Sequence, residues 1–125
     1  MATEIAFVNS NPDIISLGHN ADQAVLRLAI GPGTYLVFGR VVVGNGDGDQ
    51  QIAGARLTSK DGVNPMDAVQ VRIPGGTAQT LCLQGTLIVA PGSTDIVDIR
   101  CGTFRGSAGQ SSLFAIDVAR LKFAP

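Results

Sequence analysis

Residues 34–43 read Thr-Tyr-Leu-Val-Phe-Gly-Arg-Val-Val-Val, and this nearly unbroken apolar run decides how the chain folds. A β-strand with one wet face alternates apolar and polar residues, because successive side chains point to opposite faces. Here apolar side chains fall on both faces, which indicates a strand that is covered on both sides. Residues 113–118, Leu-Phe-Ala-Ile-Asp-Val, repeat the feature near the end of the chain.

Other short apolar runs separated by glycine, proline and asparagine indicate an all-β protein without helices. The spacing predicts a sandwich or barrel of about 8–10 strands in a single domain, residues 1–125. Gly85 interrupts one long run, where we expect a bulge or bend. The expected strands are residues 3–8, 14–17, 24–30, 34–43, 52–58, 68–73, 80–89, 95–104 and 112–123.

The chain is too short to cover its doubly apolar strands by itself. Residues 68–73 alternate cleanly, with Gln70 and Arg72 on one face, so only one of the two sheets contains doubly covered strands. Charged residues make up 15% of the chain, against about 25% in typical soluble domains. Both observations predict an oligomer in which one sheet face is covered by other copies of the chain.

Charge and hydropathy exclude several classes of partner. The net charge is −1, so no basic surface for nucleic acid or an anionic membrane is predicted. No apolar stretch approaches the roughly 18 residues of a membrane span, and the N-terminus lacks the pattern of a secretory signal. We therefore expect a cytoplasmic protein, or one that belongs to a particle or leaves the cell by a route without such a signal.

Several segments resemble strands of the C1q and tumour-necrosis-factor (TNF) superfamily. Residues 33–38, Gly-Thr-Tyr-Leu-Val-Phe, are similar to its Gly-x-Tyr-x-Phe strand. Residues 80–89, 95–100 and 111–116 resemble later strands, and the whole likeness extends over about residues 24–121. The resemblance implies a two-sheet jelly-roll sandwich that forms a homotrimer. The sheet containing the first, the long central and the last strands would line the threefold axis.

Five residues on two strands are predicted to face neighbouring subunits: Leu36, Phe38, Arg40, Leu113 and Asp117. An ion pair between Arg40 and Asp117, within or across the interface, is one interpretation of these two charges, and solvated or unpaired side chains are the alternative. Because both faces of residues 34–43 are apolar, the alternative that the Tyr35 face lines the axis stays open.

The resemblance also bears on function. The chain lacks a collagen-like stalk and a membrane anchor, so it is more similar to bacterial or phage members that serve as trimeric structural, assembly or binding modules. Residues 105–108, Arg-Gly-Ser-Ala, resemble a segment of a bacterial TNF-like lectin. This likeness implies an alternative function, carbohydrate binding near the subunit boundary through Arg105 and Ser107. An ordinary loop between strands is the other interpretation of that segment.

No catalytic or cofactor motif is present, so we expect no enzyme activity, no cofactor and no metal. His19 is the only histidine, and no motif supplies it with a catalytic partner. Residues 45–49, Asn-Gly-Asp-Gly-Asp, are predicted to form a turn. Calcium binding is the weaker alternative, because the glutamate that closes an EF-hand loop is missing. Cys82 and Cys101 are predicted to be buried free thiols, and a disulfide between them stays open.

Overall fold

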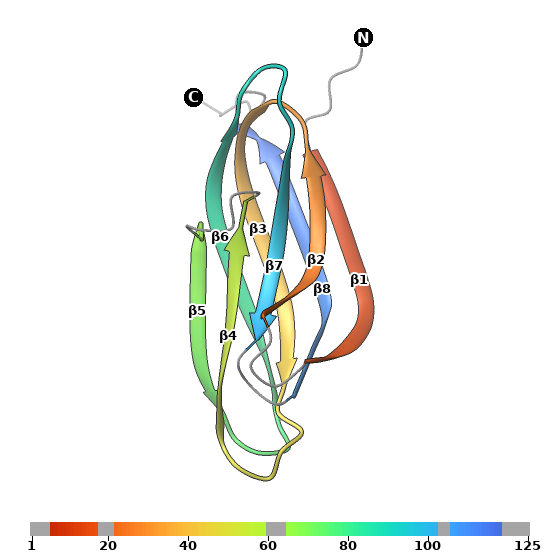
Figure 1. The fold of residues 1–125 in the computed structure, drawn as a ribbon, viewed down its shortest axis with the longest axis vertical. Helices are drawn as coiled ribbons and strands as arrows, with labels where there is room; N and C mark the ends of the chain where they lie inside the picture. Colours follow the sequence, from red (N-terminus) through yellow and green to blue (C-terminus); the bar gives the residue numbers. More distant parts are fainter. Residues whose placement is uncertain (1–5, 18–21, 60–64, 103–105, 119–125) are drawn as a thin grey trace, which may run out of the picture.

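The computed structural model describes residues 6–17, 22–59, 65–102 and 106–118, and these residues form two layers of antiparallel strands (Figure 1). The eight strands are β1 (Ala6–Leu17), β2 (Asp22–Ile30), β3 (Gly33–Gly44), β4 (Gln51–Thr58), β5 (Asp67–Ile73), β6 (Ala78–Val89), β7 (Asp95–Gly102) and β8 (Gly106–Asp117). The predicted all-β sandwich is confirmed.

The order of the strands is that of a jelly roll. One sheet has the order β1-β8-β3-β6 and the other β2-β7-β4-β5. Pairing is nested along the chain: β1 pairs with β8, β2 with β7, β3 with β6, and β4 with β5. Consecutive strands therefore mostly lie in different sheets, and the two sheets wrap around one shared core.

Alternate side chains of every strand point into the space between the sheets. In β3, Tyr35, Val37, Val41 and Val43 are at most 1% exposed. The Tyr35 ring meets the Phe7 ring edge-on, with centroids 5.9 Å apart, and its hydroxyl lies 2.9 Å from two backbone carbonyl oxygens of the β2–β3 turn. This inward face of β3 therefore forms the centre of the monomer core. Of the two orientations that the sequence left open, the structure shows the one in which Leu36 and Phe38 point outward.

Two strand boundaries differ from the prediction. β1 is one strand that continues through the turn-like residues 9–13, because the register shifts between Asn11 and Ile14 and this irregularity accommodates a proline on an edge strand. β8 begins at Gly106, where we expected a loop. A Cβ on Gly109 would lie 2.3 Å from the Asp13 carbonyl oxygen. A small residue is therefore needed here for β1 to lie this close to β8.

The predicted bend at Gly85 is wrong. Strands β3 and β6 pair without any shift in register over their whole length. Gly85 instead makes room for Met66, whose Cβ lies 2.7 Å from the position that a Cβ on Gly85 would occupy. The glycine is explained by packing between the sheets and not by a break in the strand.

The cysteine prediction is half correct. Both thiols are free, Cys101 is buried in the core, and Cys82 is exposed. Cys82 lies on β6 opposite Arg40, on the outward face of its sheet. Burial, and secondarily the negative charge of Asp22, raise the pKa of the Cys101 thiol to about 12.

The segment between β3 and β4 is a turn organised by Asn45, as predicted. The buried Asn45 side chain donates through Nδ2 to the carbonyl oxygens of Asp49 and Ile73, at 2.8 and 2.9 Å. Its Oδ1 accepts from the Asp47 backbone N–H at 3.0 Å and from Gln51 Nε2 at 2.8 Å. The amide thus uses its full hydrogen-bonding capacity on the protein itself.

Candidate functional site: two contrasting sheet faces

The outward face of the sheet β1-β8-β3-β6 carries rows of apolar side chains, which we call the apolar face. Val8, Phe114 and Phe38 lie opposite one another on three adjacent strands. Ile116 and Leu36 form the next row. The rings of Phe38 and Phe114 are tilted by 34° with centroids 6.4 Å apart. Phe38 is 39% exposed and Leu36 36% exposed, so the monomer leaves large apolar groups in water.

The structure corrects two of the five residues predicted to face neighbouring subunits. Leu36, Phe38 and Arg40 point outward, but Leu113 is fully buried in the core and Asp117 is also buried. The reason is the register between β3 and β8: Phe114 stands opposite Phe38, so its neighbour Leu113 must point inward. Phe114 and Ile116 take the places on the apolar face that were assigned to Leu113 and Asp117.

The predicted ion pair between Arg40 and Asp117 is therefore wrong. Arg40 lies opposite Ser112 on the outward face, whereas Asp117 lies on the inward side, close to Gly33. Arg40 forms no ion pair with any residue that the structure describes. It borders a shallow depression of about 510 Å³ on the apolar face, lined also by Phe38, Phe114 and Asp67.

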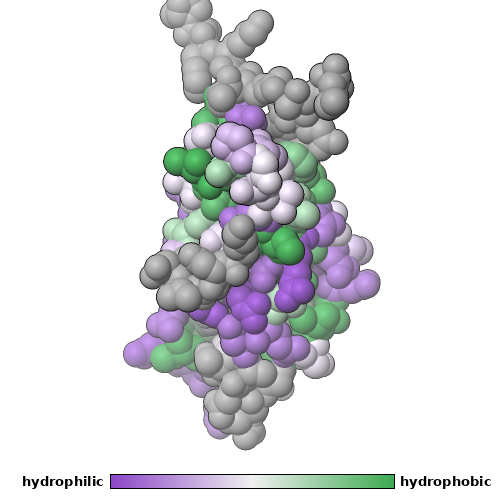
Figure 2. Space-filling model, turned by 45° about the horizontal axis from the view of Figure 1, so that its top comes forward, coloured by the Kyte–Doolittle hydropathy of each residue, from purple (hydrophilic) through white to green (hydrophobic). Residues whose placement is uncertain are grey.

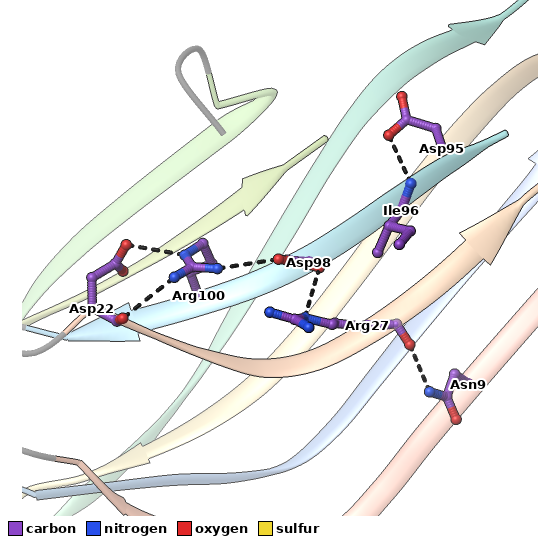
Figure 3. A network of polar contacts seen from close by, with 7 residues as sticks. All are labelled: Asn9, Asp22, Arg27, Asp95, Ile96, Asp98 and Arg100. Carbon is purple, nitrogen blue, oxygen red and sulfur yellow. Dashed lines mark hydrogen bonds and ion pairs between the residues drawn. The ribbon is translucent and has the colours of Figure 1, made fainter. Parts of the chain in front are cut away.

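The outward face of the second sheet, β2-β7-β4-β5, carries a network of charged side chains (Figures 2 and 3). Asp22 accepts hydrogen bonds from Arg56 and, at 3.0 Å, from Arg100 Nε. Asp98 joins Arg100 at 3.2 Å and Arg27 at 3.5 Å. The hydrogen bond with Asp22 raises the pKa of Arg100 against the opposing effect of its burial. In Figure 2, hydrophilic residues gather across the middle of the face turned to the viewer.

The sequence pattern of β5 predicted a wet face for this sheet, but not the charged network. Asp22 and Arg100 are 78 positions apart in the chain, and Asp22 and Arg56 are 34 apart. Only the nested pairing of strands brings them together. The sequence does place an arginine on each of several strands, which was the available signal for a charged face. Without the register between the strands, these arginines could not be assigned to one network.

The residues predicted to bind a sugar are placed only in part. Ser107 is half-buried in β8, opposite Gly44, and forms part of a strand instead of a loop. Arg105 and His19 both lie outside the described residues. Among residues 6–17, 22–59, 65–102 and 106–118, no cluster of three histidine, cysteine or acidic side chains is arranged to hold a metal ion. The same ranges contain no helix with the length and apolar character needed to cross a membrane.

Comparisons with known proteins identify the fold. No family model matches the sequence, and no curated protein matches it either. Solved structures do match in shape. Eiger TNF from S. frugiperda is 10% identical with a TM-score of 0.69, over 97% of this chain and 96% of that chain. The globular domain of zebrafish complement 1qA is 12% identical with a TM-score of 0.55, over 92% and 98%.

A viral protein shares the same architecture. A chain in the structure of infectious bursal disease virus, Gx strain, is 14% identical with a TM-score of 0.56. The match covers 93% of this chain but 34% of the viral chain. The protein therefore has the C1q/TNF-like jelly-roll fold that the sequence motifs predicted.

Proposed function

We propose that the chain is a non-catalytic homotrimeric module for assembly or binding, whose copies associate through the apolar face. The single observation that carries this proposal is the contrast between the two outward faces. One presents Phe38, Phe114 and Leu36 to solvent, and the other presents arginines and aspartates in ion pairs. Each such apolar side chain gains roughly 1.5–3 kcal/mol when it is fully buried.

Three copies are proposed because the resemblance to the C1q and TNF superfamily implies a threefold arrangement around this sheet. The first, long central and last strands of that resemblance correspond to β1, β3 and β8, which carry the apolar face. A bacterial or phage particle is the setting in which we propose that the module acts. The presence of the same architecture in a viral structure supports an assembly role.

The experiment measures the mass of the protein in solution by light scattering. We expect about three times the 12.9 kDa of one chain. Phe38→Asp should reduce the mass to that of a monomer, because it places a charge where copies meet. Ile96→Asp is the matched control, since Ile96 is similarly exposed, at 46%, but lies on the other sheet. A monomeric wild-type protein, or equal effects of the two variants, contradicts the proposal.

Sugar binding near the subunit boundary through Arg105 and Ser107 stays a prediction from the resemblance. A glycan array with the wild-type protein and Arg105→Ala tests it directly. Binding that Arg105→Ala abolishes would show a lectin site, and an array without signal contradicts it.

A further inference from the structure

The charged face of the sheet β2-β7-β4-β5 contains a depression of about 560 Å³, which we call the trough. Its shape follows from two neighbouring rows of outward residues. The first row is Gln70, Gly54, Gly102 and Asp22, one from each strand of the sheet. Two glycines lie between two longer side chains, so the floor is bare. Adjacent strands are about 4.8 Å apart, which makes the first row about 14 Å long.

The second row places two arginines beside that bare floor. Ala68, Arg56, Arg100 and Ala24 stand opposite one another on the same four strands. Asp22 reaches across from the first row and binds both guanidinium groups through a single oxygen, Oδ2. The arginines are therefore held in place at the trough by a carboxylate that belongs to the protein.

Much hydrogen-bonding capacity in the trough is unused by the described residues. Arg56 makes one hydrogen bond, from Nη2 to Asp22, and a guanidinium has five N–H donors. The second Asp22 oxygen, Oδ1, has no partner among the residues that the structure places, nor has the Gln70 amide. The trough thus offers free donors and a free acceptor side by side, above a floor without side chains.

The charge of this face is opposite to that of the chain. Among the described residues, its outward side chains include four arginines, Arg27, Arg56, Arg72 and Arg100, and two aspartates, Asp22 and Asp98, which gives +2 for this part of the face on a chain whose net charge is −1. A ligand with negative charge is favoured there. Because Oδ1 of Asp22 accepts hydrogen bonds while Arg56 donates them, the ligand must also carry groups that do both. Hydroxyl groups meet this requirement.

We propose that the trough binds an acidic saccharide, a short sugar chain whose rings carry carboxylates. Ring hydroxyls accept from Arg56 and the Gln70 amide and donate to Asp22 Oδ1, while a ring carboxylate pairs with the free edge of Arg56. The sugar rings lie over Gly54, Gly102 and Ala68. At neutral pH the side chains of an acidic peptide only accept hydrogen bonds, whereas a sugar hydroxyl both donates and accepts, which favours a saccharide over an acidic peptide. This site is distinct from the apolar face and does not require a trimer.

Isothermal titration calorimetry with tetragalacturonate tests the proposal, with neutral maltotetraose and the peptide tetraglutamate as comparison ligands. Arg56→Gln should weaken tetragalacturonate binding at least about tenfold, as expected for the loss of a charge-assisted contact. Arg72→Gln is the matched control. It removes the same charge from the same sheet face, but Arg72 does not line the trough, so the affinity should change by less than about twofold.

Gly54→Val provides a second test that leaves every charge in place. A Cβ at this position would make ordinary contacts of 3.6 Å with Gln70 and with the Val69 backbone, so the strand accepts it while the valine fills the floor. Binding should again fall at least about tenfold, with an unchanged thermal midpoint. The proposal is overturned if wild-type protein does not bind tetragalacturonate, or if Arg56→Gln and Arg72→Gln weaken it equally. Equal binding of maltotetraose or of tetraglutamate overturns it as well.

Discussion

Phe38 of β3 and Phe114 of β8 lie directly opposite each other on the outside of the sandwich, with ring centroids 6.4 Å apart. Leu113, one position before Phe114, points the other way and is completely buried. Two adjacent apolar residues of one strand therefore have different roles. One belongs to the core of the monomer, and the other belongs to the apolar face that we propose as the subunit contact.

Alanine substitutions should separate these roles. Leu113→Ala should lower the free energy of unfolding by about 2–5 kcal/mol, because it leaves a cavity in the core. Phe114→Ala should weaken association of the subunits more than it destabilises the monomer, because its ring is partly solvated in one chain. Urea denaturation combined with light scattering at several protein concentrations measures both effects. A Leu113→Ala protein with unchanged stability contradicts the placement of β8.

Gly75→Ala should destabilise the loops at the end of the sandwich. A Cβ at Gly75 would lie 2.4 Å from the Gly48 carbonyl oxygen, and both groups belong to backbone that cannot move aside cheaply. The expected cost is about 1–3 kcal/mol. Gly46→Ala is the control in the same region, since nothing lies within 4 Å of its Cβ, and it should be neutral or stabilise by up to about 1 kcal/mol. Thermal denaturation of both variants checks the difference.

Asn45→Ala should lower the free energy of unfolding by about 2–4 kcal/mol. The substitution removes four hydrogen bonds and leaves the groups that formed them with Asn45 without this partner inside the protein. Asp49→Ala, an exposed side chain in the same loop, should change it by less than about 0.5 kcal/mol. The urea midpoints of wild type and variants should not respond to calcium or to EDTA. If calcium raises the wild-type midpoint and Asp49→Ala removes that gain, the loop is a cation site and our interpretation is wrong.

The Cys101 thiol should make the free energy of unfolding fall at alkaline pH. The pKa of its thiol is raised to about 12 in the fold, from 9.0 without burial. Below about pH 9 both states are protonated and the full stability is present. At higher pH the unfolded thiol ionises while the folded one does not, so stability falls until the pH passes about 12.

The comparison with Cys101→Ala isolates this effect. The difference in unfolding free energy between wild type and the variant should shrink by about 1 kcal/mol between pH 8 and pH 10. Urea denaturation at the two pH values measures it. A difference that stays constant would mean that the Cys101 thiol ionises equally in both states.

The fold was predictable where the apolar pattern has only one interpretation. Residues 68–73 alternate cleanly and form β5, and the apolar run of residues 34–43 forms β3. The prediction failed where neighbouring residues are equally apolar. Leu113 and Phe114 are adjacent, and only the register of β8 against β3 decides which one points inward. That register includes a shift beside Gln110, which adopts a φ of 46°, and no feature of the sequence fixes such a shift.

The two faces differ in how far the sequence could predict them. An apolar outward face follows from β3 alone, because both sets of alternate residues in that strand are apolar. The charged network depends on three strands, β2, β4 and β7, and the trough on all four strands of that sheet. Only the pairing of β4 with β7 places Gly54 opposite Gly102 and brings Arg100 beside them. Single residues without a local pattern cannot be assigned to one row before the topology is known.

The nested order of strands has a consequence for synthesis of the protein. β8 lies between β1 and β3 in its sheet, so the first strand has no hydrogen-bonded neighbour in its sheet until the eighth is available. A nascent chain on the ribosome must therefore hold β1 unpaired while six further strands are made, and the edge of β3 that later pairs with β8 unpaired while four are made. Such long-range closure is slow and leaves strand edges open to aggregation. Early folding in the cell should depend on chaperones that shield these edges until translation has passed Asp117.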